Sequence, residues 1–119
     1  MHRFILALAA PLVLAAGVAD AHPKLLRAFP APGAAVTGSP PAIRIAFNEP
    51  VFARLSAIAL TTPVGAPVKL GTTVADPRDR RQLSAPIIGR LAPGLYKVTW
   101  RAVAADTHRV TGGFAFRVR

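Results

Sequence analysis

Several short runs of the chain alternate apolar and polar residues with a period of two. In Ile43–Phe47 the odd positions are bulky and apolar, whereas Arg44 points to the other side. Ile58 and Leu60 follow the same period. It recurs in two further runs, Tyr96–Arg101 and Phe114–Val118. Such alternation is typical of strands with one buried and one solvated face. The pattern therefore predicts a protein built from short β-strands.

Clusters of proline and glycine separate these runs. They lie at residues 30–33 (PAPG), 38–41 (GSPP), 62–65 (TPVG) and 92–94 (APG). The chain has 12 prolines, and their spread would break any long helix. Short strands with regular turn signals predict an all-β fold, an antiparallel β-sandwich or barrel. The polar segment Asp76–Arg81 is predicted to be an exposed loop.

The first 21 residues differ from the rest of the chain. Met1–Arg3 is a short basic start, and Phe4–Ala16 is an almost unbroken apolar run. Ala19–Ala21 then puts small residues at the two positions that a signal peptidase reads. The apolar run is shorter than the ~20 residues that a membrane-spanning helix needs. We therefore expect residues 1–21 to be a cleaved signal peptide that exports the chain.

The expected mature domain, residues 22–119, begins with His22. The chain has no cysteine, which excludes a disulfide scaffold, a thiolate zinc site and a thiol nucleophile. Its formal net charge of +10 raises the possibility of an anionic partner. Nucleic acid is not expected, because single strands are bound on exposed aromatic residues. The candidate aromatics have core-facing positions in the alternation: Phe47, Trp100, Phe114 and Phe116.

The two histidines of the expected mature domain carry the most informative chemistry. His108 stands two positions after Asp106, and extended backbone projects such a pair to one side. An amino-terminal His22 would offer its α-amine and its ring as a chelate. Three nitrogens and one oxygen suit tetragonal Cu(II) or Ni(II), and the Irving–Williams order favours copper. Two simpler interpretations stay open: the D-x-H pair caps a turn, and the position of His22 is an accident of cleavage.

The residues after His22 argue against a peptide-type chelate. A free amino-terminal peptide can wrap Cu(II) with deprotonated backbone amides, but Pro23 has no N–H to lose. Lys24 stands where an imidazole would complete such a wrap. The remaining ligands are therefore expected to come from the fold, as a preformed tertiary site.

Three ordered motifs resemble the CopC family of periplasmic copper-binding proteins. The first is Ala21–Leu25 (AHPKL) followed by Phe29–Gly33 (FPAPG), and the second is Phe47–Val51 (FNEPV). The third begins PGLYKVTWR at Pro93 and continues through the D-x-H pair to Gly112. The resemblance extends nearly from one end of the expected mature domain to the other.

The resemblance implies a fold and a set of ligands. The fold is a seven-stranded Greek-key β-sandwich or barrel, Ig-like or cupredoxin-like, that binds Cu(II) in the periplasm. His22 would supply the amine and ring nitrogens, His108 a nitrogen and Asp106 an oxygen. Glu49 matches an acid beside that site, as a weak ligand or an orienting partner. An ordinary turn acid is the alternative for Glu49.

Two departures from the family bear on the metal. Some members carry a methionine-rich Cu(I) site, whereas residues 22–119 contain neither methionine nor cysteine. Because Cu(I) prefers sulfur ligands, no such site is expected here. Thr107 and Arg109 replace the family's usual glycine and proline around the D-x-H pair.

These features predict a monomeric, non-enzymatic Cu(II)-binding protein that sequesters or carries copper in the periplasm. The expected partners are the copper ion and, from the resemblance, an inner-membrane copper transporter. The alternative is a histidine-brace copper oxidase or monooxygenase, because such enzymes also combine an amino-terminal histidine with a second one. Asp106 argues against the enzyme, since its carboxylate would occupy an equatorial position that oxygen needs.

Overall fold

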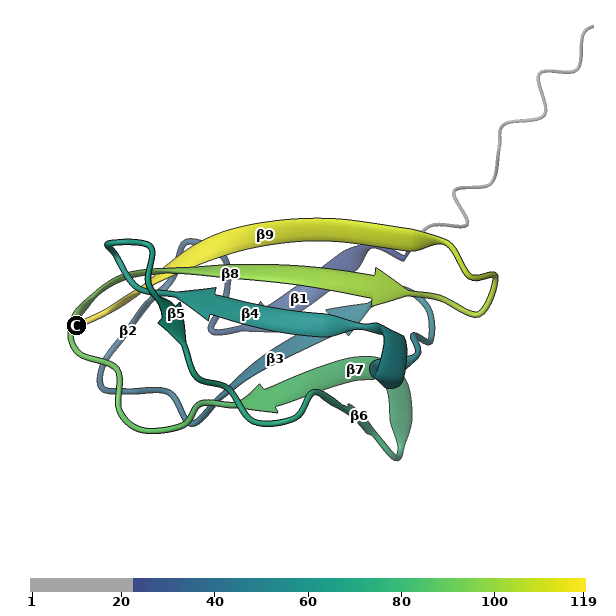
Figure 1. Ribbon diagram of the computed structural model, residues 1–119, viewed down its shortest axis with the longest axis horizontal. Coiled ribbons are helices and arrows are strands. Elements are labelled where there is room, and N and C mark those ends of the chain that lie inside the picture. Colours follow the sequence, from purple (N-terminus) through teal and green to yellow (C-terminus); the bar gives the residue numbers. More distant parts are fainter. Residues whose placement is uncertain (1–22) are drawn as a thin grey trace, which may run out of the picture.

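The computed structural model describes residues 23–119, which form two β-sheets packed face to face (Figure 1). One sheet has four strands in the order β1-β3-β7-β6, and the other has five in the order β2-β9-β8-β4-β5. The elements are β1 (Leu25–Phe29), β2 (Ala35–Val36), β3 (Ala42–Phe47), the 3-10 helix η1 (Ala53–Leu55), β4 (Ala57–Thr61), β5 (Pro67–Val68), β6 (Val74–Asp76), β7 (Asp79–Pro86), β8 (Gly94–Val103) and β9 (Arg109–Val118). The β-sandwich predicted from the sequence is confirmed. Within this part of the chain no helix is both long and apolar enough to cross a membrane.

Two short strands account for the difference between the seven strands expected and the nine found in residues 23–119. β2 and β5 have two residues each. β2 also pairs in parallel with β9, whereas the sequence predicted an antiparallel arrangement. The hydrogen bonds from Gly33 N–H to Ala115 O (2.7 Å) and from Arg117 N–H to Ala34 O (2.8 Å) hold this segment along the edge of β9. Pairs this short leave no alternation for a sequence pattern to detect.

The core lies between the sheets, where the alternation predicted it. In β3 the side chains of Ile43, Ile45 and Phe47 are buried and Arg44 is exposed. In β8 the side chains of Tyr96, Val98 and Trp100 are buried, and the residues between them are exposed. The Phe47 and Trp100 rings meet edge to face across the two sheets, with centroids 5.0 Å apart.

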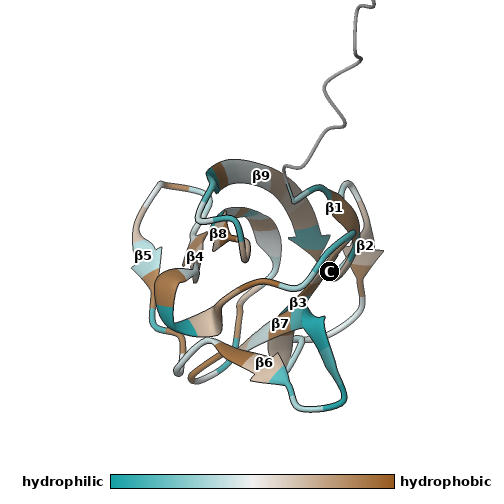
Figure 2. Cartoon of the chain, turned by 90° about the vertical axis from the view of Figure 1, so that its right-hand side faces the viewer, coloured by the Kyte–Doolittle hydropathy of each residue, from teal (hydrophilic) through white to brown (hydrophobic). Residues whose placement is uncertain are grey.

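The segment Asp76–Arg81 is a tight hairpin, so the prediction of a loop there was wrong. β6 ends at Asp76 and β7 begins at Asp79. The Arg81 Nε–H donates to Asp79 Oδ1 over 2.9 Å, and this hydrogen bond lowers the pKa of Asp79 to about 2. The hairpin is hydrophilic, whereas the beginning of β6 is hydrophobic (Figure 2). Because these strands are charged at their ends, the alternation that marks a strand is missing.

One end of the sandwich gathers segments that are far apart in the sequence (Figure 1). Leu25 pairs with Phe47, which brings the beginning of β1 to the end of β3. An isolated bridge between Val51 and Ala104 then ties the segment after β3 to the end of β8. The β8–β9 turn, the segment after β3 and the beginning of β1 therefore share this end, which we call the site end.

Candidate metal centre

The structure brings the Asp106 and His108 side chains together at the β8–β9 turn. Asp106 Oδ2 lies 2.7 Å from His108 Nδ1. The backbone N–H of His108 donates to Asp106 Oδ1 over 3.1 Å. Both side chains are partly exposed, so an ion can reach them from solvent. The pair is thus oriented by its own backbone before any ligand arrives.

The backbone of this pair is a turn, so the prediction of extended backbone at Asp106–His108 was wrong. Thr107 has a φ of 68°, in the left-handed region. Its N–H donates to Ala104 O over 2.9 Å, and Ala104 N–H donates to His108 O over 3.3 Å. The two side chains meet because the turn folds back and Asp106 accepts the His108 N–H. The interpretation of the pair as a turn cap is therefore true of its backbone, and it is compatible with metal binding.

Replacing Thr107 with glycine is expected to stabilise the protein by about 0.5–1 kcal/mol. A β-branched residue at positive φ is strained, whereas glycine adopts this conformation without a steric penalty. The entropy that glycine adds to the unfolded chain offsets part of the gain. Urea unfolding of the Thr107→Gly variant would measure the change. A lower midpoint than that of the parent protein would contradict a left-handed Thr107.

His22 lies outside the described residues, but the two residues that follow it are held firmly. Pro23 is completely buried. The Lys24 N–H donates to Asn48 Oδ1 over 2.7 Å, and the Asn48 N–H donates to Lys24 O over 3.0 Å. The chain therefore enters the described domain at the site end. Sequence analysis missed the role of Asn48, although it lies within the Phe47–Val51 motif.

Glu49 lies at the site end without joining the other candidate ligands. It is half-buried in the segment that connects β3 to the Val51–Ala104 bridge. Within residues 23–119, however, no group of three or more His, Cys, Asp or Glu side chains could hold a metal ion. Of the predicted ligands within residues 23–119, the structure brings together Asp106 and His108.

The spacing of this pair suits two neighbouring ligands of one ion. Two donors that each lie about 2.0 Å from a metal, at right angles to it, are about 2.8 Å apart. The distance between Asp106 Oδ2 and His108 Nδ1 is 2.7 Å. An ion could therefore bind both atoms with little change in the distance between them.

Comparisons with known proteins agree on one family. The CopC domain matches residues 25–119. Copper resistance protein C of Pseudomonas syringae pv. tomato is 34% identical over 113 residues, which cover 90% of this chain and 88% of that protein. Protein YobA of Escherichia coli K12 is 34% identical over 99 residues, with 83% and 80% of the two chains covered.

Solved structures show the same likeness. The crystal structure of PcoC, a methionine-rich copper resistance protein from Escherichia coli, superimposes with a TM-score of 0.76 at 31% identity. The match covers 83% of this chain and all of the PcoC chain. This chain, by contrast, has a single methionine, Met1.

Proposed function

This chain belongs to the CopC family of copper-binding resistance proteins, and on that premise we propose that it sequesters or carries one Cu(II) ion in the periplasm. The observation that carries the proposal is the Asp106–His108 pair, whose 2.7 Å spacing suits two donors of one ion. Its support is the anchoring of Lys24 to Asn48, which holds the residue two positions after His22 at the site end.

The proposed ligands are three nitrogens and one oxygen. His108 Nδ1 and Asp106 Oδ2 would hold the ion together with the α-amine and the ring of His22. This set requires cleavage after Ala21, because only then is the His22 nitrogen an amine. Glu49 would act beside these donors, as a distant ligand or by orienting a ligand. Without methionine or cysteine in residues 22–119, the chain lacks the sulfur donors of a Cu(I) site.

The proposed role is that of a monomeric carrier rather than an enzyme. Four donors in a tetragonal plane leave no equatorial position for oxygen, which opposes the histidine-brace alternative. Export by the signal peptide would place the protein where an inner-membrane copper transporter could receive the ion. Absence of ascorbate-driven peroxide formation by the copper-loaded protein is the expected result, measured against free Cu(II) as the reference.

Cu(II) titration of the processed protein, residues 22–119, tests the function. Competition with a chromophoric chelator should give one tight equivalent, and electron paramagnetic resonance should show a tetragonal, nitrogen-rich centre. Zn²⁺ should compete poorly, as the Irving–Williams order requires. Weak binding of several equivalents with no defined spectrum would mean that the copper role of the family has been lost in this chain.

Replacing Asp106 with asparagine tests whether Asp106 is a metal ligand or a residue that only orients His108. Asparagine keeps an oxygen that can accept the His108 N–H, so the turn should survive, but it removes the negative donor. We expect Cu(II) affinity to fall by about 10–100-fold and the paramagnetic parameters to shift away from those of the parent. Weaker binding with an unchanged spectrum would instead make Asp106 a residue that only positions His108.

A further inference from the structure

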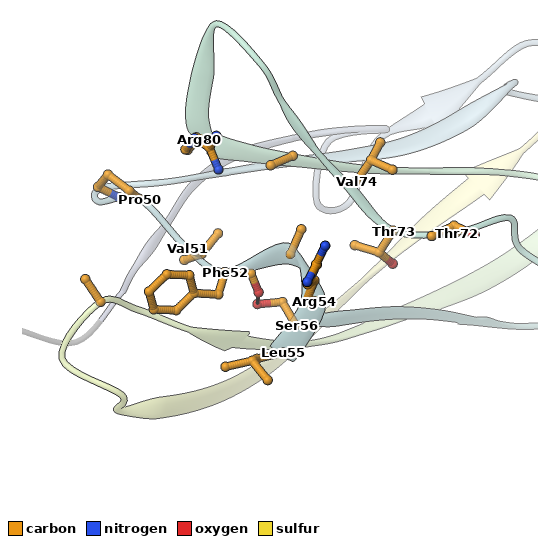
Figure 3. A pocket seen from close by; sticks show the side chains of 13 residues that line it. Pro50, Val51, Phe52, Arg54, Leu55, Ser56, Thr72, Thr73, Val74 and Arg80 are labelled. Atoms are coloured by element: carbon orange, nitrogen blue, oxygen red, sulfur yellow. Dashed lines mark hydrogen bonds between the residues drawn. The ribbon is translucent and has the colours of Figure 1, made fainter.

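A cavity of about 930 Å³ opens between η1 and β6, outside the proposed copper ligands (Figure 3). Its walls come from the segment between β3 and β4, from the beginning of β6, from β7 and from Ala105. Most of the lining is apolar, and its polar side chains belong to Arg54, Ser56, Thr72, Thr73 and Arg80. Pockets of about 300–1,000 Å³ with mostly apolar walls are typical of sites for small ligands.

Hydrophobic side chains at the mouth of the cavity are exposed to solvent. Phe52 is 47% exposed, Leu55 53% and Val74 48%. All three line the cavity, from η1 and its flank on one side and from β6 on the other. Clustered exposed apolar side chains on a small protein mark a binding site more often than an inert surface.

The charges around the cavity have one sign. Arg54 on η1 and Arg80 on β7 both line it (Figure 3). No carboxylate is among the lining residues. In the part of the chain that the structure describes, the ion pairs join Arg81 to Asp79 and His108 to Asp106, and neither includes these two arginines. An apolar recess lined by two arginines and no carboxylate complements an anion that carries an apolar group.

Hydrogen bonds hold the cavity walls in place. Val51 N–H donates to Arg80 O over 3.1 Å, which ties the segment after β3 to β7. The buried hydroxyl of Ser56 donates to Phe52 O over 2.7 Å and accepts the Val103 N–H over 3.1 Å. The walls are therefore formed by the fold before any ligand binds, which lowers the entropic cost of binding.

We propose that this cavity binds a single-chain amphipathic anion, an alkyl carboxylate of the fatty-acid type. The alkyl chain packs against Phe52, Leu55 and Val74, and the carboxylate is held by Arg54 and Arg80. Because the site uses none of the proposed copper ligands, copper binding and carboxylate binding can succeed or fail separately.

Calorimetric titration with sodium octanoate, decanoate and dodecanoate tests the proposal, using protein produced from the full 119-residue chain. We expect one equivalent to bind and the affinity to rise about fourfold for each added methylene. Dodecyltrimethylammonium, which has the same chain and a positive head, should bind at least about tenfold more weakly than dodecanoate.

Matched variants test which arginines hold the carboxylate of dodecanoate. Arg54→Gln and Arg80→Gln should each weaken dodecanoate binding by about tenfold or more. Arg117→Gln is the control, because Arg117 is an exposed arginine on β9 that does not line this cavity. Circular dichroism spectra would confirm that all three variants are folded.

Three results would overturn the proposal. They are the absence of saturable dodecanoate binding, equal affinity for the cationic analogue, and an equal loss of affinity in Arg117→Gln. If dodecanoate does not bind and sedimentation equilibrium shows a dimer that Leu55→Ser dissociates, the occupant is a second copy of the chain.

Discussion

Adding one alanine ahead of His22 is expected to weaken Cu(II) binding by at least about 100-fold. The extension converts the His22 α-amine into a peptide nitrogen, which must lose its proton before it can bind the metal. The ion then loses a donor that is linked to the His22 ring, and with it the high effective concentration that makes a chelate strong. Chelator competition on the two forms, each released from a fusion with a defined cut, measures the change.

The fold itself should not respond to this extension. Pro23 is buried and Lys24 is bonded to Asn48 in the described domain, and both residues follow His22. A protein that carries the extra alanine after Arg119 is the matched control, and its Cu(II) affinity should equal that of the parent. Equal affinities of the two extended forms would remove the amine from the proposed ligands and leave only side-chain donors.

Replacing Phe47 with alanine is expected to destabilise the protein by about 3–5 kcal/mol. The Phe47 side chain is 1% exposed and meets Trp100 across the two sheets. Its loss leaves a cavity in the core and removes an edge-to-face ring contact. For a domain of this size the melting temperature should fall by about 12 °C or more.

The same substitution at Phe29 provides the control, because that side chain on β1 is 50% exposed. We expect Phe29→Ala to cost less than about 1 kcal/mol. Urea unfolding followed by the fluorescence of Trp100, the single tryptophan, would measure both variants. Similar costs for Phe47→Ala and Phe29→Ala would contradict the placement of Phe47 in the core.

Phe47→Ala should also lower the Cu(II) affinity of the protein. Phe47 pairs with Leu25 and precedes Asn48, whose side chain holds Lys24. A looser end of β3 would therefore weaken the hydrogen bonds between Asn48 and Lys24, which hold the residue two positions after His22 at the site end. At a temperature where the variant is still folded, its Cu(II) affinity should be lower than that of Phe29→Ala.

The alternation in Ile43–Phe47 and Tyr96–Arg101 was enough to predict the sheets and their buried faces. The reason is that a strand exposes alternate side chains to two different environments, so the pattern is local. The hairpin Asp76–Arg81 was missed because charged residues occupy its strand ends. β2 and β5 were missed because two residues cannot display a period.

The sequence by itself determined the fold class, the family and the residue types able to bind copper, since each rests on local patterns or ordered motifs. Only the tertiary structure decided how these residues meet. The left-handed Thr107 turns Asp106 onto His108, and the contact of Lys24 with Asn48 holds the beginning of the domain at the same end of the sandwich. The cavity with Arg54 and Arg80 also exists only in three dimensions, because its walls come from segments as far apart in the chain as Pro50 and Ala105. Such long-range contacts depend on how the two sheets pack, and no local pattern in the chain records them.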